Sequence, residues 1–302
     1  MTLDNNLILL SGTLNISTNT LTVKKDLTVD GGSLLATDGN IDADGSVFIS
    51  SGTLSAPGSG KFFTVGSDWT KSAQAIFNHS QGAVTFDGPS ESISRISGNT
   101  TFYDFVCTTG KKELRFTAGS TQNIEHTLTL TGRAKNLIKL RSSSPGTVFN
   151  INNLTSQTVA FVDVQDSNAS PQRITAHTSK DSGNNPNWIF STSLLTWEGS
   201  VDTNWGEDNN WNLGYVPNAT DEVIIVRTNN NPILDQARTA EALTIRPGAI
   251  LDLAGNDLRV TDGFHNAGII NYKIIIINII TKVFDNKSIF GCISISIVFY
   301  FA

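Results

Sequence analysis

The segment NIDADGSV, residues 40–47, has the residue order of the first half of an EF-hand-type calcium loop. Its alternating oxygen-bearing side chains are Asn40, Asp42 and Asp44. The twelfth position of such a loop requires a bidentate acidic residue, and the sequence has Ser51 there. The flanking sequence is strand-like rather than helical. Two interpretations therefore stay open, a bound calcium ion or solvated turn residues.

A second oxygen-rich segment, DTNWGEDNNW, lies among tryptophans. Carboxylates and amides in one loop could hold a hard cation such as calcium, and the candidate ligands are Asp202, Asn204 and Asp208. Indole rings beside them could stack on sugar rings, and the candidates are Trp197, Trp205 and Trp211. Asn and Asp also cap turns, and tryptophans are usually buried. Structural packing, calcium binding and carbohydrate contact are therefore the three alternatives.

Catalysis on a polysaccharide needs acidic or basic side chains that converge in a groove. The nearest group of such residues along the chain is Asp163, Asp166, Arg173, His177 and Asp181. We interpret them as turn residues. The sequence has no P-loop, no GxSxG, no dinucleotide fingerprint, and no HxH or HExxH among its scattered histidines. We expect no catalytic residues and no cofactor, apart from the possible calcium.

The charge of the chain argues against a nucleic-acid partner. The net charge is -6 in 302 residues, and no long Lys/Arg block occurs. Charged residues make up 16% of the chain, below the roughly 25% of average soluble domains. The two cysteines, Cys107 and Cys292, form neither a disulfide framework nor a CxxC motif. We expect Cys107 to be a small buried residue of a strand.

A twenty-residue period organises the first part of the chain. SGTL, GGSL and SGTL begin at residues 11, 31 and 51, which aligns Gly12, Gly32 and Gly52, and likewise Leu14, Leu34 and Leu54. Short alternating runs such as TLTL and FVDV favour strands, and helical periodicity is scarce. Strands this short are stable when coils stack, with leucines inside and glycines at corners that need positive φ. The sequence predicts an all-β, right-handed parallel β-helix (β-solenoid), with a second, truncated β module of similar type.

The segments GSDW, FNHSQGAVTFDG and TFYDF resemble repeats of large secreted bacterial surface proteins. Such adhesin and autotransporter-like proteins have parallel β-helix passenger regions, and the resemblance covers roughly residues 10 to 190. The later pattern W-x-G, N-W, N-W, V-P resembles a module repeated in extracellular bacterial proteins. These resemblances imply an architecture and a location, and they carry no catalytic residues.

The predicted organisation has four parts: solenoid repeats at 1–190, a linker at 191–195, a tryptophan-rich β module with further coils at 196–272, and a tail at 273–302. Composition changes abruptly at Lys273, and we expect the tail to be non-native or disordered. Charged and polar residues at 282–287 split its apolar run, which argues against a membrane span. The start lacks the features of a signal peptide, and we expect it to lie partway along a larger polypeptide.

These observations predict a structural or adhesive segment of a secreted or cell-surface bacterial protein, without catalytic activity. Expected partners are surface glycans or proteins of a host or neighbouring cell, with neither nucleic acid nor a membrane span. The alternative is a carbohydrate-active enzyme or carbohydrate-binding protein on the same β-helix scaffold.

Overall fold

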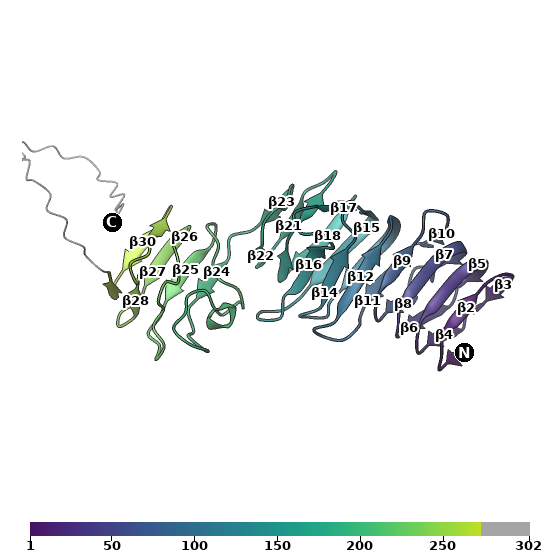
Figure 1. Cartoon of the computed structure of the whole chain (residues 1–302), viewed down its shortest axis with the longest axis horizontal. Coiled ribbons are helices and arrows are strands. Elements are labelled where there is room, and N and C mark those ends of the chain that lie inside the picture. The colour runs from purple at the N-terminus through teal and green to yellow at the C-terminus, as the bar shows by residue number, and fades with distance from the viewer. Residues whose placement is uncertain (273–302) are drawn as a thin grey trace, which may run out of the picture. The chain divides into compact units, whose positions relative to one another are not determined.

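The computed structural model describes residues 1–272, and almost all of their regular structure is short β-strands (Figure 1). One 3-10 turn, η1 (Asp208–Asn210), is the single helical element among these residues. The chain divides into two compact units, Met1–Ser193 and Leu194–Ala302. The tail predicted at 273–302 lies outside the described residues. Within the described part, no helix has the length and hydropathy of a membrane span.

Two long parallel sheets build the first unit. The first sheet contains, in spatial order, β1 (Thr2–Leu3), β4 (Thr20–Val23), β6 (Asn40–Ala43), β8 (Phe62–Val65), β11 (Ala83–Phe86), β13 (Thr100–Cys107), β15 (Thr121–Thr131), β17 (Phe149–Asn153) and β20 (Ser167–Ala169), with β18 (Ser156–Ala160) also paired to β15. The second contains β2 (Leu7–Leu9), β5 (Leu27–Leu35), β7 (Val47–Ser55), β9 (Trp69–Lys71), β12 (Ile93–Ser97), β14 (Glu113–Phe116), β16 (Ile138–Ser142), β19 (Val162–Val164) and β22 (Lys180–Asp181), with β3 (Thr13–Asn15) on β5 and β10 (Ile76–Asn78) on β7. A separate pair joins β21 (Ile174–Ala176) to β23 (Trp188–Phe190).

Each coil of the chain contributes a strand to both sheets, so each strand pairs in parallel with the equivalent strand of the next coil. Side chains of a strand alternate between its two faces, which in β4 buries Leu21 and Val23 and leaves Thr20 and Thr22 outside. Equivalent inward positions then stack from coil to coil, as in the ladder Leu21, Ile41, Phe63, Val84, Phe105 and Leu128. The predicted all-β parallel solenoid is confirmed.

The leucines of the twenty-residue period lie in one inward ladder. Leu14 pairs in register with Leu34, and Leu34 with Leu54. Leu34 and Leu54 are fully buried, whereas Leu14 is partly buried and packs against the same core. Leu14 belongs to the first coil, which has a neighbouring coil on one side of it in the described structure.

The predicted corner glycines are confirmed in two coils and corrected in one. Gly12 and Gly52 have φ of 75° and 76°. In the coil between them the positive φ belongs to Gly31, at 110°, because the register of β5 shifts after Val29. Gly32 is required for another reason, since a Cβ there would lie 2.6 Å from the Leu9 side chain.

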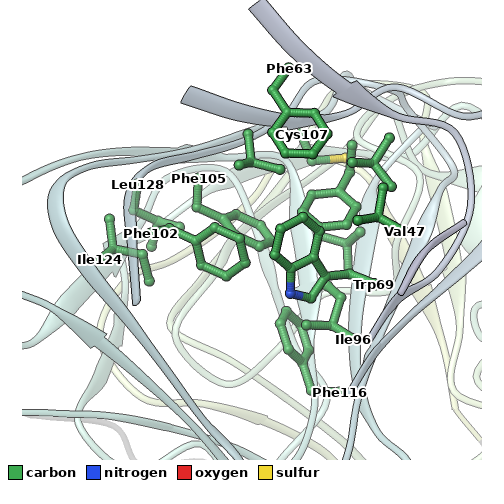
Figure 2. Packing of buried hydrophobic residues seen from close by; sticks show 14 of the residues in the cluster. Val47, Phe63, Trp69, Ile96, Phe102, Phe105, Cys107, Phe116, Ile124 and Leu128 are labelled. Atoms are coloured by element: carbon green, nitrogen blue, oxygen red, sulfur yellow. The ribbon is translucent and has the colours of Figure 1, made fainter. Parts of the chain in front are cut away.

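Aromatic side chains fill the middle of the first unit's core (Figure 2). Trp69 contacts Phe77 edge to face at a centroid distance of 5.0 Å, and its indole N–H donates to the Thr100 hydroxyl at 3.0 Å. Cys107 is buried in the same core, as predicted. Burial raises the pKa of its thiol to about 11, so the reactive thiolate is suppressed at neutral pH.

The second unit is a shorter parallel solenoid. Its strands are β24 (Leu194–Thr196), β25 (Glu222–Ile225), β27 (Ala242–Ile245) and β30 (Phe264–Asn266) in one sheet, β26 (Arg238–Ala240) with β29 (Leu258–Val260), and β28 (Ile250–Asp252) with β31 (Ile269–Asn271). All of these pairs are parallel. Part of the segment predicted as a linker, residues 194 and 195, forms the start of β24.

Replacing Leu34 with alanine should lower the free energy of unfolding by about 2–5 kcal/mol, because a fully buried leucine would leave a cavity between two coils. Leu14→Ala is the matched control and should cost less, since that side chain is partly exposed. Urea unfolding followed by circular dichroism measures both changes. Equal losses for the two variants would contradict the stacked ladder.

Candidate functional site

The segment predicted as a calcium loop is a strand. Asn40 and Asp42 lie on β6 and face outward. Asn40 donates from Nδ2 to the Thr20 hydroxyl at 3.2 Å and accepts the Phe62 N–H at 3.1 Å. Asp42 accepts from the Thr64 hydroxyl at 2.9 Å. The side chains therefore join neighbouring coils instead of curving around a common centre.

Asp44, the third predicted ligand, follows β6 and pairs with Lys24, with 3.0 Å between Nζ and the carboxylate. This hydrogen bond raises the pKa of the exposed Lys24 ammonium. Asn40, Asp42 and Asp44 therefore each have partners of their own on neighbouring coils. Residues 1–272 contain no group of three or more His, Cys, Asp or Glu side chains arranged to hold a metal ion.

The tryptophan-rich segment forms the first coil of the second unit. It leaves the sheet after β24 and returns to it at β25, which pairs directly with β24. Within this segment Asn204 makes a parallel bridge to Ile233, and Ile233 makes one to Asp252. The segment is therefore stacked on the coils that follow it, as a solenoid coil with a long excursion.

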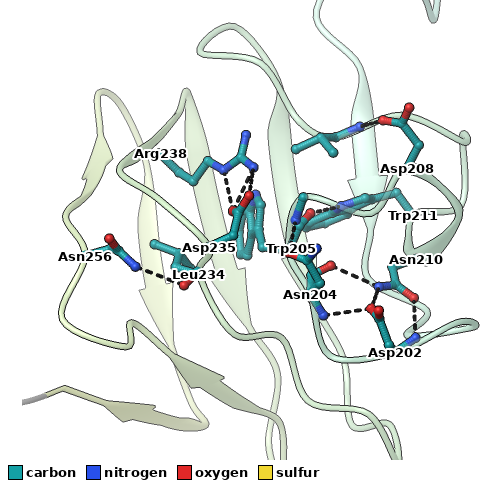
Figure 3. Close-up of polar contacts among 12 residues, drawn as sticks. Asp202, Asn204, Trp205, Asp208, Asn210, Trp211, Leu234, Asp235, Arg238 and Asn256 are labelled. Carbon is teal, nitrogen blue, oxygen red and sulfur yellow. Dashed lines mark hydrogen bonds and ion pairs between the residues drawn. The ribbon is translucent and has the colours of Figure 1, made fainter.

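Asn210 organises this coil from within (Figure 3). Its side chain is fully buried, and its Oδ1 accepts the N–H groups of Val201 at 2.8 Å and Asp202 at 3.1 Å. Its Nδ2 donates to the Asp202 carboxylate at 2.8 Å and to the Asn204 carbonyl at 3.0 Å. One amide thus satisfies four polar groups of the excursion, and sequence reasoning did not identify it.

The predicted cation ligands of this segment have separate hydrogen-bond partners. Besides Asn210, the Asp202 carboxylate accepts the Asn204 N–H at 2.8 Å. The Asn204 side chain accepts the Gly206 N–H at 2.9 Å. Asp208 accepts the N–H of Val216 at 2.9 Å. Each oxygen fixes a turn of the backbone, which corresponds to the structural alternative of the three considered above.

The three tryptophans predicted as a sugar platform lie in the core. Trp197, Trp205 and Trp211 are 0%, 1% and 0% exposed. Trp211 contacts both others edge to face, at centroid distances of 5.1 and 4.8 Å. The indole N–H of Trp197 donates to the Asn230 carbonyl at 2.7 Å, and that of Trp211 to the Trp205 carbonyl at 2.9 Å. These rings therefore expose no face on which a sugar could stack. They fill the core of the second unit in its first coil.

The acidic residues considered for catalysis are held by structural contacts. Asp163 is buried on β19, where one carboxylate oxygen lies 2.6 Å from the Arg141 guanidinium and the other accepts the Ser182 hydroxyl at 2.6 Å. Asp166 is also buried and accepts from Gly146 N–H at 3.0 Å and Asn184 Nδ2 at 2.7 Å.

Asp181 binds its own turn, accepting the Gly183 N–H at 2.9 Å and the Asn185 amide at 2.6 Å. Arg173 and His177 are exposed, and no described contact joins either of them to these acids. The group that is close in sequence is therefore spread over separate turns and does not converge on one reacting position.

Sequence reasoning missed a stack of rings on the surface of the first unit. The Tyr103 ring lies between His79 and His126, at centroid distances of 5.6 and 4.6 Å. Glu125 accepts from His79 at 3.1 Å, and Asp104 lies 2.8 Å from His126. The three rings are 24 and 23 positions apart, so a period slightly longer than twenty would have indicated them.

A buried lysine is the other feature that sequence reasoning missed. The Lys112 ammonium donates to the Ser92 hydroxyl at 2.8 Å and lies 3.5 Å from the Gly66 carbonyl. A Cβ at Gly88 would lie 2.6 Å from the same nitrogen, so glycine makes room for it. Burial lowers the pKa of Lys112 below 10.5. Lys112 is two positions before the buried Leu114, so strand alternation points its side chain inward. This spacing is the sequence feature from which the buried lysine could have been predicted.

Raising the pH should stabilise the native protein relative to Lys112→Met. The unfolded chain binds more protons than the native one between the lowered native pKa and 10.5, so the free energy of unfolding rises with pH across that window. Urea unfolding at neutral pH and at pH about 10 measures the difference. Lys61→Met, at an exposed lysine, controls for the loss of one positive charge. A difference that is independent of pH would contradict the buried charge.

Replacing Asn210 with alanine should destabilise the second unit by about 2 kcal/mol or more, because the fully buried amide makes four hydrogen bonds to Val201, Asp202 and Asn204 that alanine cannot make. Asn209→Ala, at the exposed neighbour, should cost much less. Tryptophan fluorescence during urea unfolding follows this unit through Trp197, Trp205 and Trp211, and the signal of Trp69 and Trp188 in the first unit should be the same in both variants. Equal stability of the two variants would show that the amide does not organise the coil.

Comparison with known families finds one match, to the model of a family described as Domain of unknown function (DUF8693), over residues 196–274. The matched stretch begins at the last residue of β24 and includes the whole tryptophan-rich coil. It is therefore similar to this family over most of the described second unit. Comparison with curated proteins and with solved structures finds no match.

Proposed function

We propose that this chain is a structural and adhesive segment of a secreted or cell-surface bacterial protein and has no catalytic role. The observation that supports this most is the uninterrupted parallel ladder of the first unit, from β1 to β20 in one sheet and from β2 to β22 in the other. A stack of this kind resists bending, because backbone hydrogen bonds join each coil to both neighbours. It is suited to project a binding surface away from a cell.

The contacts of the acidic residues also support a non-catalytic role. A glycoside hydrolase needs two carboxyl groups that face each other across a substrate. Asp163 and Asp166 are buried, and both oxygens of each have a protein partner. The weakly charged, Asn- and Thr-rich surface and the resemblance of GSDW and TFYDF to adhesin-like repeats support an extracellular setting.

Antibodies against residues 1–193 should label intact cells of the bacterium that encodes this chain. In-frame deletion of the same residues should reduce attachment of the cells to glycan-coated surfaces and leave polysaccharide breakdown in the medium unchanged. Labelling that requires lysis would contradict the surface location. Loss of polysaccharide breakdown, reproduced by Asp163→Ala, would favour the enzyme alternative.

A further inference from the structure

Positive charge is concentrated in one segment of an acidic chain. Residues 95–141 contain eight Lys and Arg and three Asp and Glu, a surplus of five (8 − 3), whereas the whole chain has a net charge of -6. The segment spans β12, β14 and β16, three successive strands of the second sheet. Its charge is therefore gathered on neighbouring coils.

Three arginines form a column on the outer face of these strands. Arg95 pairs in register with Arg115, and Arg115 with Arg141. Leu114 and Leu140, on the opposite face, are buried. Adjacent strands lie about 4.8 Å apart, so three like charges stand directly opposite one another, an arrangement that disfavours the fold.

Further cations surround this column. Lys139 is exposed on β16, in register between Glu113 and Asp163. Lys111 and Arg133 are exposed at the corners that precede β14 and β16, and the two corners are joined by hydrogen bonds from the Lys111 N–H. We refer to the whole set as the basic stripe: Arg95, Lys111, Arg115, Arg133, Lys139 and Arg141.

The carboxylates beside the basic stripe neutralise only part of it. The ion pairs are Arg95 with Asp68 at 3.7 Å, Lys111 with Glu91 at 2.9 Å, Arg115 with Glu113 at 2.6 Å, and Arg141 with Asp163 at 2.6 Å. Six cations thus face four acids, and within residues 1–272 Arg133 and Lys139 form no ion pair, although Lys139 lies in register with Glu113 and Asp163, which pair with arginines. Arg141, with a side chain 20% exposed, is held by the buried Asp163 and is structural, whereas Arg95 has a side chain 58% exposed. Exposed pairs contribute little to stability, so an external anion can replace them.

We propose that the basic stripe binds a linear acidic polysaccharide, whose carboxylate or sulfate groups lie along the arginine column. This inference rests on the proposed adhesive function and names its ligand class. A guanidinium binds planar oxyanions through two parallel hydrogen bonds, and the column repeats that donor on each coil. A polymer with a charge on successive sugars matches such a repeat.

A single-stranded nucleic acid fits the stripe less well. Proteins that bind such strands combine positive charge with aromatic side chains on which the bases stack. The outward residues of β12, β14 and β16 are Ile93, Arg95, Ser97, Glu113, Arg115, Lys139 and Arg141, and none of them is aromatic.

The test uses the full chain with four probes: polygalacturonate, heparin, neutral dextran and DNA. The stripe variant is R95Q/R115Q/K139Q, which leaves Arg141 in place because it pairs with the buried Asp163. The matched control is K25Q/K61Q/R173Q, which removes the same charge from exposed positions of the first unit. Calorimetry measures binding, and circular dichroism confirms that each variant is folded.

Polygalacturonate or heparin should bind the native chain, and high salt should weaken the binding. The stripe variant should lose affinity about 10-fold or more, because three charge-assisted contacts are removed, and the control should change less than about 2-fold. Equal losses in the two variants, or equal binding of dextran, would overturn the proposal. Tighter binding of DNA would assign the stripe to nucleic acid. Cleavage of polygalacturonate would contradict the non-catalytic function without contradicting anion binding by the basic stripe. Absence of binding would overturn the proposal for the basic stripe and leave the proposed structural function standing.

Discussion

Each coil of this protein is held by parallel hydrogen bonding to the equivalent strand of its neighbours, and the rest of the structure depends on this register. A residue that faces inward in one coil lies against an inward residue in the next, so the core is a set of ladders rather than a compact centre. Leu34 lies between Leu14 and Leu54, and Ile41 between Leu21 and Phe63. Coil length therefore changes in the turns and at a few bulges, such as the one between Phe102 and Asp104, while the inward ladders continue on either side.

The same register governs the outer face, and it explains the unusual surface composition. Identical charges at one position would stand about 4.8 Å apart in every coil. Asn and Thr avoid this repulsion because each can both donate and accept. Asn152 donates to Asn123 at 2.9 Å, and Asn123 to Thr101 at 3.3 Å, across three coils. The arginine column differs from these neutral ladders, because it places like charges at one position of three successive coils. This part of the outer face is therefore the strongest candidate for binding an external anion.

The two units fill the first coil of their cores differently. In the first unit, partly buried leucines such as Leu7, Leu9 and Leu14 pack against the coils that follow. In the second unit, Trp197, Trp205 and Trp211 lie fully inside, and the excursion that carries them is fixed by the buried amide of Asn210. Large aromatic rings and the buried amide of Asn210 give this coil a core of its own. The family model matches residues 196–274 and none of the first unit, which agrees with the second unit being a separate module.

The sequence by itself determined the fold class, because period-two alternation and the spacing of Leu14, Leu34 and Leu54 depend only on local geometry and coil length. It also determined that Cys107 is buried. Only the tertiary structure decided which polar residues meet, since coil length varies beyond residue 60. Arg95, Arg115 and Arg141 are 20 and 26 positions apart, and Glu125 reaches His79 over 46 positions. The tertiary structure also decided that the tryptophans lie inside, because an indole ring near polar residues has the same local pattern whether it packs in a core or lies on a surface.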